Sequence, residues 1–206
     1  MPEQVIIIGA GGHARVIADI LLCRGADLLG YLDDETADHF PGQNVLGRVE
    51  DAIRYAGRVK FIIGIGRNAL REKIALGLDG KVEFFTAVHP SAVIAKDVAL
   101  GEGTVVMANA VINPGAVIGK HVIINTAATV DHDCVLEDYV HLSPGVHLSG
   151  TVHVGKRCWL GTGSVVINNV GLAPDCVVGA GAAVVENLTE SGVYVGVPAR
   201  KVGREQ

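Results

Sequence analysis

A six-residue period runs without interruption through the second half of the chain. From Ile94 to Val184, every sixth residue is Ile, Leu or Val, which makes sixteen consecutive aliphatic positions. Four residues after each aliphatic position comes mostly a small or β-branched residue. The residue directly after the aliphatic position is often glycine. One hexapeptide of this kind buries little apolar surface alone, so the repeats become stable only when they stack. The period therefore predicts a parallel β-helix built from hexapeptide repeats.

Roughly the first 85 residues show a different pattern, in which short apolar runs alternate with segments of helical periodicity. Strands that alternate with helices are typical of βαβ units around a small parallel sheet. We therefore expect an α/β domain over residues 1–86 and an all-β domain over residues 87–206 that includes a C-terminal tail. The predicted strands span residues 4–9, 28–34, 59–66 and 82–88, and the predicted helices span residues 13–25 and 68–78.

Composition and charge exclude several classes of protein. The formal net charge is −5 and the basic residues are evenly spread, so no basic footprint for nucleic acid is present. The apolar runs are too short to cross a membrane, and the first residues lack the basic segment of a secretory signal. Four cysteines without paired spacing indicate a reducing compartment. We expect a cytoplasmic protein that neither binds nucleic acid nor inserts into a membrane.

The turn "GAGGH" at residues 9–13 follows a predicted strand and opens a predicted helix. Backbone N–H groups at such a helix start form an anion site that suits a nucleoside diphosphate. Asp33, about twenty residues later, could hold a ribose or base hydroxyl. NAD binding is an alternative, because Gly9, Gly11 and Ala14 satisfy a relaxed dinucleotide motif. Against it, the segment is short for a dinucleotide-binding domain and no second half follows.

His132 is the distinctive histidine of the repeat region, because it lies between Asp131 and Asp133. A carboxylate beside a neutral imidazole fixes its tautomer and stabilises the imidazolium formed when the ring takes a proton. That arrangement suits a general base. A polar pair at a solvated corner of a β-helix needs no function, however, so both interpretations stay open on spacing alone.

The repeat region resembles the left-handed β-helix acyltransferases, in which three hexapeptides make one turn. That resemblance implies that His141, His147 and His153, six residues apart, point outward from three different faces. They could not bind one metal ion within a single chain, so a zinc site would need neighbouring subunits. We expect no metal, and a trimeric zinc hydratase remains an alternative. The inward positions of Cys134 and the other repeat cysteines predict that they are packing residues.

The whole chain resembles the two-domain sugar acyltransferases of bacterial polysaccharide and glycoprotein assembly. These include the N-acetyltransferases of nucleotide-linked 4-amino sugars and the related sialic acid O-acetyltransferases. The resemblance runs through "IIIGAGGHARVIADI", "GYLDD", "IIGIGRNALREKI", "NTAATVDHDCVLEDYVHLSPGVHLSGTV" and "GVYVGVPARKV". It implies a Rossmann-like domain that binds the nucleotide sugar and a left-handed parallel β-helix that binds acetyl-CoA as co-substrate. It also implies a homotrimer with its active site at the subunit interface.

The same resemblance assigns roles to individual residues. His132 matches the general base of the family, and Asp133 matches the acidic residue after it, which is Glu in some members. The positions that match substrate contacts are Gly11, Gly12, His13, Asp33, Asp34 and Gly66. The positions that match acetyl-CoA contacts are His141, Gly150, Thr162 and Ala180.

We therefore expect an acetyl-CoA-dependent N-acetyltransferase that acts on the amino group of a nucleotide-linked 4-amino-deoxy sugar. A sugar O-acetyltransferase remains open, because one histidine can serve an amine or a hydroxyl. A non-catalytic nucleotide-sugar sensor, in which the β-helix only trimerises, is a further alternative. Outside the proposed site, we expect His39 and His121 at the surface, and Cys23 and His89 in structural roles.

Overall fold

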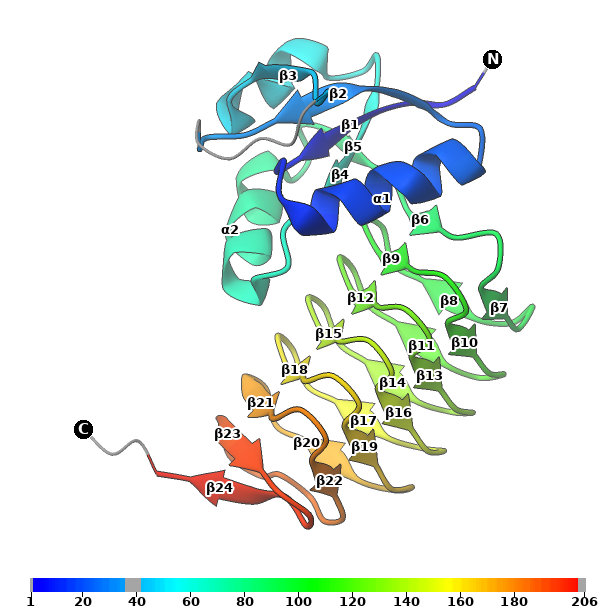
Figure 1. The fold of residues 1–206 in the computed structure, drawn as a ribbon, viewed down its shortest axis with the longest axis vertical. Coiled ribbons are helices and arrows are strands. Elements are labelled where there is room, and N and C mark those ends of the chain that lie inside the picture. The colour runs from blue at the N-terminus through cyan, green and yellow to red at the C-terminus, as the bar shows by residue number, and fades with distance from the viewer. Residues whose placement is uncertain (1, 36–41, 204–206) are drawn as a thin grey trace.

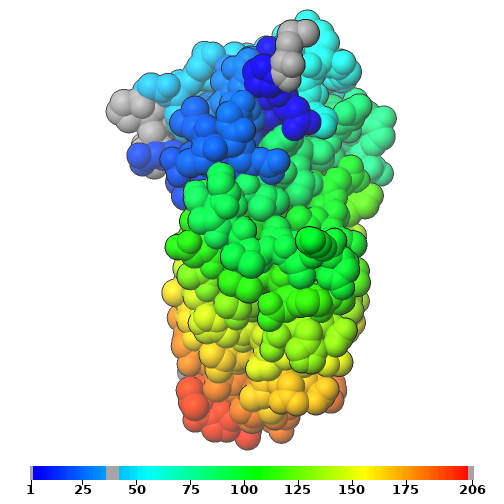
Figure 2. Space-filling model, turned by 90° about the vertical axis from the view of Figure 1, so that its right-hand side faces the viewer, coloured from blue at the N-terminus to red at the C-terminus, as the bar shows by residue number. Residues whose placement is uncertain are grey.

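A small α/β layer lies at one end of a long β-helix (Figure 1). The computed structural model describes residues 2–35 and 42–203. In the space-filling view the α/β layer covers the top of the stack, and successive coils follow one another toward the C-terminal end (Figure 2). Within the described residues, no helix is long and apolar enough to cross a membrane.

The α/β layer is built on a five-stranded parallel sheet with the strand order β3-β2-β1-β4-β5. Its central strand carries the run "VIII", and Val5 and Ile7 face α1 whereas Ile6 and Ile8 face η1 and α2. Burial on both faces is what a continuous apolar run predicts. The elements are β1 (Gln4–Ile8), α1 (Gly12–Cys23), β2 (Asp27–Leu32), β3 (Val45–Gly47), η1 (Val49–Tyr55), β4 (Lys60–Ile63), α2 (Asn68–Leu78) and β5 (Glu83–Phe84).

The β-helix has three faces, and each hexapeptide contributes one short strand to the next face in turn. Val111 pairs with Thr129, eighteen residues on, so three hexapeptides make one coil, as expected. Face I holds β6 (Ala87–Val88), β9 (Val105–Val106), β12 (Ile123–Ile124), β15 (His141–Leu142), β18 (Trp159–Leu160), β21 (Cys176–Val178), β23 (Gly192–Val195) and β24 (Arg200–Val202). Face II holds β7 (Val93–Ile94), β10 (Val111–Ile112), β13 (Thr129–Val130), β16 (His147–Leu148), β19 (Val165–Val166) and β22 (Ala183–Val184). Face III holds β8 (Ala99–Leu100), β11 (Val117–Ile118), β14 (Val135–Leu136), β17 (His153–Val154) and β20 (Gly171–Leu172).

The core of the β-helix is made by the two inward columns of the repeat. Both the aliphatic position and the small position four residues later are buried through the middle coils. Cys134, Cys158 and Cys176 are free thiols with no exposed surface, which confirms that they are packing residues. The left-handed parallel β-helix predicted from the resemblance is therefore the fold of the second part of the chain.

One continuous apolar cluster joins the α/β layer to the first coils. Ile17 and Leu21 of α1 pack with Ala87, Val105 and Ile123 of face I. Burial of this size fixes the layer on the β-helix, since each fully buried aliphatic side chain contributes about 1.5 to 3 kcal/mol. The helix α1 therefore lies directly on the first coils of the β-helix.

Two expectations differ from the structure. The single strand predicted over residues 82–88 is divided, because Phe85 donates to Phe61 of the α/β sheet whereas Ala87 already donates to Thr104 of the β-helix. His121, expected at the surface, is only 3% exposed. Its ring stacks on Tyr139 and meets the edge of Phe84, so the α/β layer covers a corner that would otherwise be solvated. His39 lies outside the described residues.

Candidate active site

The His132–Asp133 pair lies at an exposed corner between face II and face III. His132 Nδ1 is 2.8 Å from Asp133 Oδ2, so the ring donates to the carboxylate and Nε2 is left as the basic nitrogen. Asp131 holds the backbone, because its Oδ1 accepts the His132 N–H at 2.7 Å and the Asn113 Nδ2 at 2.8 Å. The sequence prediction that a carboxylate orients His132 is thus consistent with the geometry of the corner.

Local backbone conformation brings the two side chains of this pair together. Asp133 has a φ of 58°, in the left-handed region that the tight corner requires and that Asp tolerates better than most residues. The neighbouring coils leave room for both side chains. A Cβ on Gly115 would lie 2.5 Å from Asp133 Oδ1, and a Cβ on Gly150 would lie 2.5 Å from His132 Nε2. Gly150 therefore contacts the general-base candidate through its bare backbone.

The negative charges beside His132 stabilise the protonated form of its ring. The hydrogen bond to Asp133 raises the pKa of His132 above its usual value, and the negative charge of Asp131 acts in the same direction. A higher pKa makes the neutral ring a stronger base, at the cost of a smaller neutral fraction at a given pH. The corner is therefore suited to taking up a proton from a bound acid.

A second cluster, made by His13, Gly66 and His141, lies where the α/β layer meets face I. His141 Nδ1 is 3.2 Å from the Gly66 carbonyl oxygen, which fixes the tautomer with Nε2 unprotonated. The His13 and His141 rings have centroids 6.3 Å apart, and Trp159 stacks beside His141 with centroids 6.1 Å apart. Three of the residues assigned from the resemblance therefore meet at one place.

Both histidines of this cluster are neutral near pH 7. Burial, with the nearby charge of Arg71, lowers the pKa of His13 to about 4. The same two causes, with a contribution from His13, lower the pKa of His141 to about 3. The buried Nε2 of His13 has no hydrogen-bond partner among the residues that the structure describes. Because an unpaired buried polar atom costs free energy, this nitrogen is suited to a ligand group.

Arg71 on α2 was not singled out in the sequence, yet it organises this cluster. Its guanidinium is 1% exposed and donates to the carbonyl oxygens of Ile65, Gly66, His121 and Tyr139. A further bond reaches the side chain of Asn68. These contacts join the Gly66 loop to two corners of the β-helix. A charged residue within "NALREKI" looks like part of a solvated helix face, so sequence offered no signal for this role.

The "GAGGH" turn presents an open helix start. Gly11 caps α1 without a side-chain hydrogen bond, and a Cβ on Gly11 or Gly12 would meet no atom within 4 Å. Asp33 closes the turn, because its Oδ2 accepts the Ala10 N–H at 2.6 Å and its Oδ1 accepts the Glu35 N–H at 2.8 Å. Asp34 accepts the Val49 N–H at 3.0 Å. Contacts between either carboxylate and a nucleotide stay predictions.

The remaining candidates occupy other parts of the β-helix. Thr162 and Ala180 are exposed, one coil apart at the corner between faces I and II. His141, His147 and His153 begin β15, β16 and β17, so they lie on three different faces, as expected. A single chain thus separates the His132 corner from the cluster on face I. A site that used both would have to combine faces of two chains.

Comparisons with known proteins cover nearly the whole chain. Residues 4–78 match the PglD N-terminal domain. The chain is 31% identical over 186 residues to GDP-perosamine N-acetyltransferase of Escherichia coli O157:H7, which covers 85% of this chain and 82% of that protein. It is 39% identical to UDP-N-acetylbacillosamine N-acetyltransferase of Bacillus subtilis (strain 168), over 52% of each protein.

Two of the similar solved structures share the fold over 97% or more of their own length. The acetyltransferase domain of PglB from Neisseria gonorrhoeae FA1090, in complex with acetyl coenzyme A, is 32% identical, with a TM-score of 0.92 over 98% of this chain and 100% of that one. PerB from Caulobacter crescentus, in complex with CoA and GDP-perosamine, is 41% identical, with a TM-score of 0.92 over 97% of each chain. The chain therefore belongs to the family of N-acetyltransferases that act on nucleotide-linked amino sugars.

Proposed function

We propose that the protein transfers the acetyl group of acetyl-CoA to the 4-amino group of a nucleotide-linked 4-amino-deoxy sugar, with His132 as the general base. The observation that carries the proposal is the His132–Asp133 pair, with its 2.8 Å hydrogen bond at an open corner, in a chain whose relatives share both domains. Solved relatives hold CoA together with GDP-perosamine, or acetyl coenzyme A alone, which supports the choice of donor and of acceptor class.

In the proposed reaction the amine nitrogen attacks the carbonyl carbon of the thioester and a C–N bond forms. His132 Nε2 accepts the proton that the nitrogen loses, and Asp133 stabilises the resulting imidazolium through Nδ1. The C–S bond of the tetrahedral intermediate then breaks, and the imidazolium returns the proton to the departing thiolate. The products are the acetamide and free CoA, so the step needs neither a metal nor a covalent enzyme intermediate.

The proposed acceptor site combines the open start of α1 with the cluster below it. N–H groups near Gly11 and Gly12 suit the diphosphate of the nucleotide. The unpartnered Nε2 of His13 and the loop at Gly66 would then meet the sugar. Because both His13 and His141 are neutral, they can accept or donate hydrogen bonds without repelling a substrate ammonium group. The roles of Asp33 and Asp34 in nucleotide binding belong to the same proposal.

On the donor side, His141, Gly150, Thr162 and Ala180 are the proposed acetyl-CoA contacts. Gly150 lies under the ring of His132, so a thioester bound there would be next to the base. We further propose a homotrimer, because the His132 corner and the face I cluster are separated within one chain. Each site would then take His132 from one subunit and His13 and His141 from its neighbour. The four free thiols support a reducing compartment, and we expect the cytoplasm.

The test is acetyl-CoA turnover with a panel of UDP- and GDP-linked 4-amino sugars and with sialic acid. Thiol release would be followed, and the product would be analysed by mass spectrometry before and after hydroxylamine treatment. A hydroxylamine-stable acetyl group on an amino sugar is expected. A labile product would be an ester and would contradict N-acetylation, whereas no thiol release with any acceptor would contradict the enzyme assignment.

A further inference from the structure

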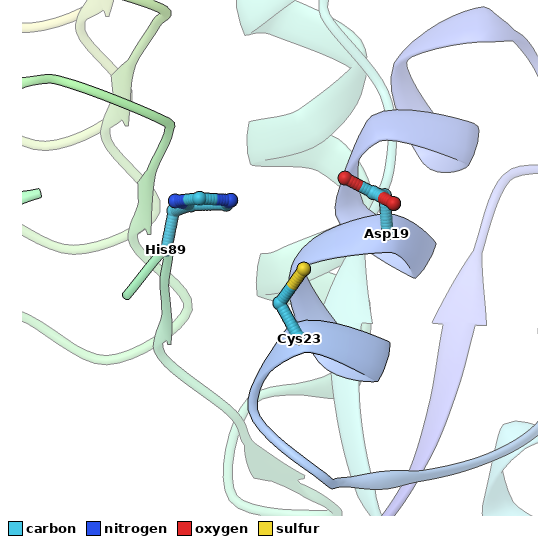
Figure 3. A group of neighbouring side chains, drawn as sticks. All are labelled: Asp19, Cys23 and His89. Carbon is cyan, nitrogen blue, oxygen red and sulfur yellow. The ribbon is translucent and has the colours of Figure 1, made fainter. Parts of the chain in front are cut away.

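Three side chains of metal-binding type meet where α1 touches the first coil of the β-helix. Asp19 and Cys23 are one helical turn apart at the end of α1 and therefore share one face of the helix. His89 follows β6 and approaches them from the β-helix (Figure 3). One ligand atom from each residue lies within 4.8 Å of the other two, and no other group of three in the described ranges does so.

We propose that Asp19, Cys23 and His89 bind one Zn²⁺ ion. A thiolate, an imidazole and a carboxylate are the ligand types that zinc accepts, and mixed sulfur and nitrogen ligands disfavour Mg²⁺ and Ca²⁺. In a tetrahedral site with ordinary zinc bond lengths, ligand atoms are about 3.3 to 3.8 Å apart. The ligand atoms would thus have to move closer together by about 1 Å. Rotation of the exposed side chains of Asp19 and Cys23 allows this. A water molecule would complete the fourth position.

The Ser91 segment fixes the direction of the His89 ring. Its Nδ1 accepts the Ser91 N–H at 3.0 Å and lies 2.8 Å from Ser91 Oγ, so Nε2 is the nitrogen left for a ligand. Figure 3 shows one ring nitrogen pointing toward the α1 residues. The Ser91 hydroxyl is itself held, because its oxygen accepts the Asn109 N–H at 3.1 Å. Zinc at Nε2 requires the proton on Nδ1, so metal binding would replace the hydrogen bond from the Ser91 N–H by one from Nδ1–H to the Ser91 hydroxyl.

The position of the site indicates what the ion does. Cys23 lies ten residues after His13 on the same helix, which places the trio about 15 Å along the helix axis from the candidate acceptor site. The zinc ion therefore takes no part in acetyl transfer. It joins α1 to the residue after β6, on the edge of the apolar cluster that unites the two parts of the chain. Since more than sixty residues separate His89 from the other two ligands along the chain, binding favours the folded state.

Cobalt provides a direct optical test on the full-length protein. Protein freed of metal with a chelator would be titrated with Co²⁺, which gives a thiolate charge-transfer band and intense visible bands in a tetrahedral site. Zn²⁺ should displace the cobalt and raise the melting temperature relative to the metal-free protein. Absence of the charge-transfer band in the wild-type protein would overturn the proposal.

Variants identify the ligands. Cys23→Ser keeps the side-chain size and should abolish the charge-transfer band and weaken Zn²⁺ binding about 100-fold or more, with smaller losses in Asp19→Asn and His89→Gln. His147→Gln, which changes an exposed histidine on face II, should bind as tightly as the wild type. A band that persists in Cys23→Ser, or equal zinc affinity in all four variants, would show that the ion binds elsewhere. Asp19→Asn and His89→Gln decide the matter if Cys23→Ser does not fold.

Discussion

At the scale of single residues, the proposed chemistry depends on how His132 is held. Asp133 accepts a hydrogen bond from the Nδ1–H group, Asp131 accepts one from the backbone N–H, and Gly150 leaves space beside Nε2. No single contact of this set is unusual for a solvated corner. Together they leave one basic nitrogen in a fixed direction, and preorganisation of this kind is what general-base catalysis requires.

Loss of the Asp133 carboxylate should change the pH dependence of the enzyme. In the proposed mechanism the neutral form of His132 is the active one, so the rate should rise as pH passes upward through its pKa. Because the hydrogen bond to Asp133 is the main cause that raises the pKa of His132, Asp133→Asn should move this rise to lower pH. The maximal rate should also fall by about 10-fold or more, because the tautomer is no longer fixed.

The control for this profile is Asp131→Asn. That change removes only the second cause of the raised pKa and keeps the Nδ1 contact, so its shift should be smaller and its maximal rate closer to the wild type. The measurement is kcat against pH for the three proteins at saturating substrates. A rise at unchanged pH in Asp133→Asn would mean that the ring titrated in the assay is not that of His132.

At the scale of elements, α2 fixes the Gly66 loop to the β-helix. Arg71 bonds two loop carbonyls and two β-helix carbonyls, and Asn68 Nδ2 donates to the carbonyl oxygens of Arg157 and Cys158. Glu72 adds ion pairs to Lys156 and Arg157. The cluster that orients His141 therefore depends on how α2 packs against the β-helix.

Replacement of Arg71 by Met should lower the free energy of unfolding by about 3 kcal/mol, because buried carbonyl oxygens lose their donor. It should also raise the KM for the acceptor more than the KM for acetyl-CoA if the Gly66 loop moves. Lys73→Met, on the exposed face of the same helix, is the matched control. It should change neither the free energy of unfolding nor the KM for the acceptor. Denaturant unfolding and steady-state kinetics measure both effects, and equal stability of the two variants would refute the role of Arg71.

Elements also show what the sequence could and could not predict. The sixteen hexapeptides and their inward columns were predictable, because each coil repeats the same packing problem at a fixed period. The division of residues 82–88 into β5 and β6 was not, since the change of hydrogen-bonding partner at Phe85 depends on where the first coil begins. Burial of His121 and Arg71 also escaped prediction. Both are covered by contacts between the two domains, which no local pattern reports.

At the scale of the whole molecule, the residues proposed for the active site lie on surfaces that are separated within one chain. His132 lies at the corner between faces II and III, whereas His13, Gly66 and His141 meet on face I. The proposed homotrimer resolves this separation by placing one subunit's corner against its neighbour's face. In this proposal the α/β layer would supply the acceptor site, and the β-helix would supply both the base and the acetyl-CoA contacts.

Mixed trimers test this shared site. His132→Ala and His141→Ala subunits, each inactive or strongly impaired alone, would be co-expressed with different tags and purified as mixed assemblies. If every site takes these residues from different chains, each mixed trimer has about one third of its sites, one of three, with both histidines intact. Recovery of about that fraction of wild-type activity is expected. Activity no greater than that of the two separate variants would place both histidines of a site in one chain.

The most direct test of the central claim is kcat for His132→Ala at saturating acetyl-CoA and amino sugar, beside the dissociation constant for acetyl-CoA. A base acts in the transition state, so kcat should fall by about 1000-fold while acetyl-CoA binds with unchanged affinity. Wild-type turnover in this variant, or a loss of rate matched by an equal loss of acetyl-CoA affinity, would contradict the assignment of His132 as the general base.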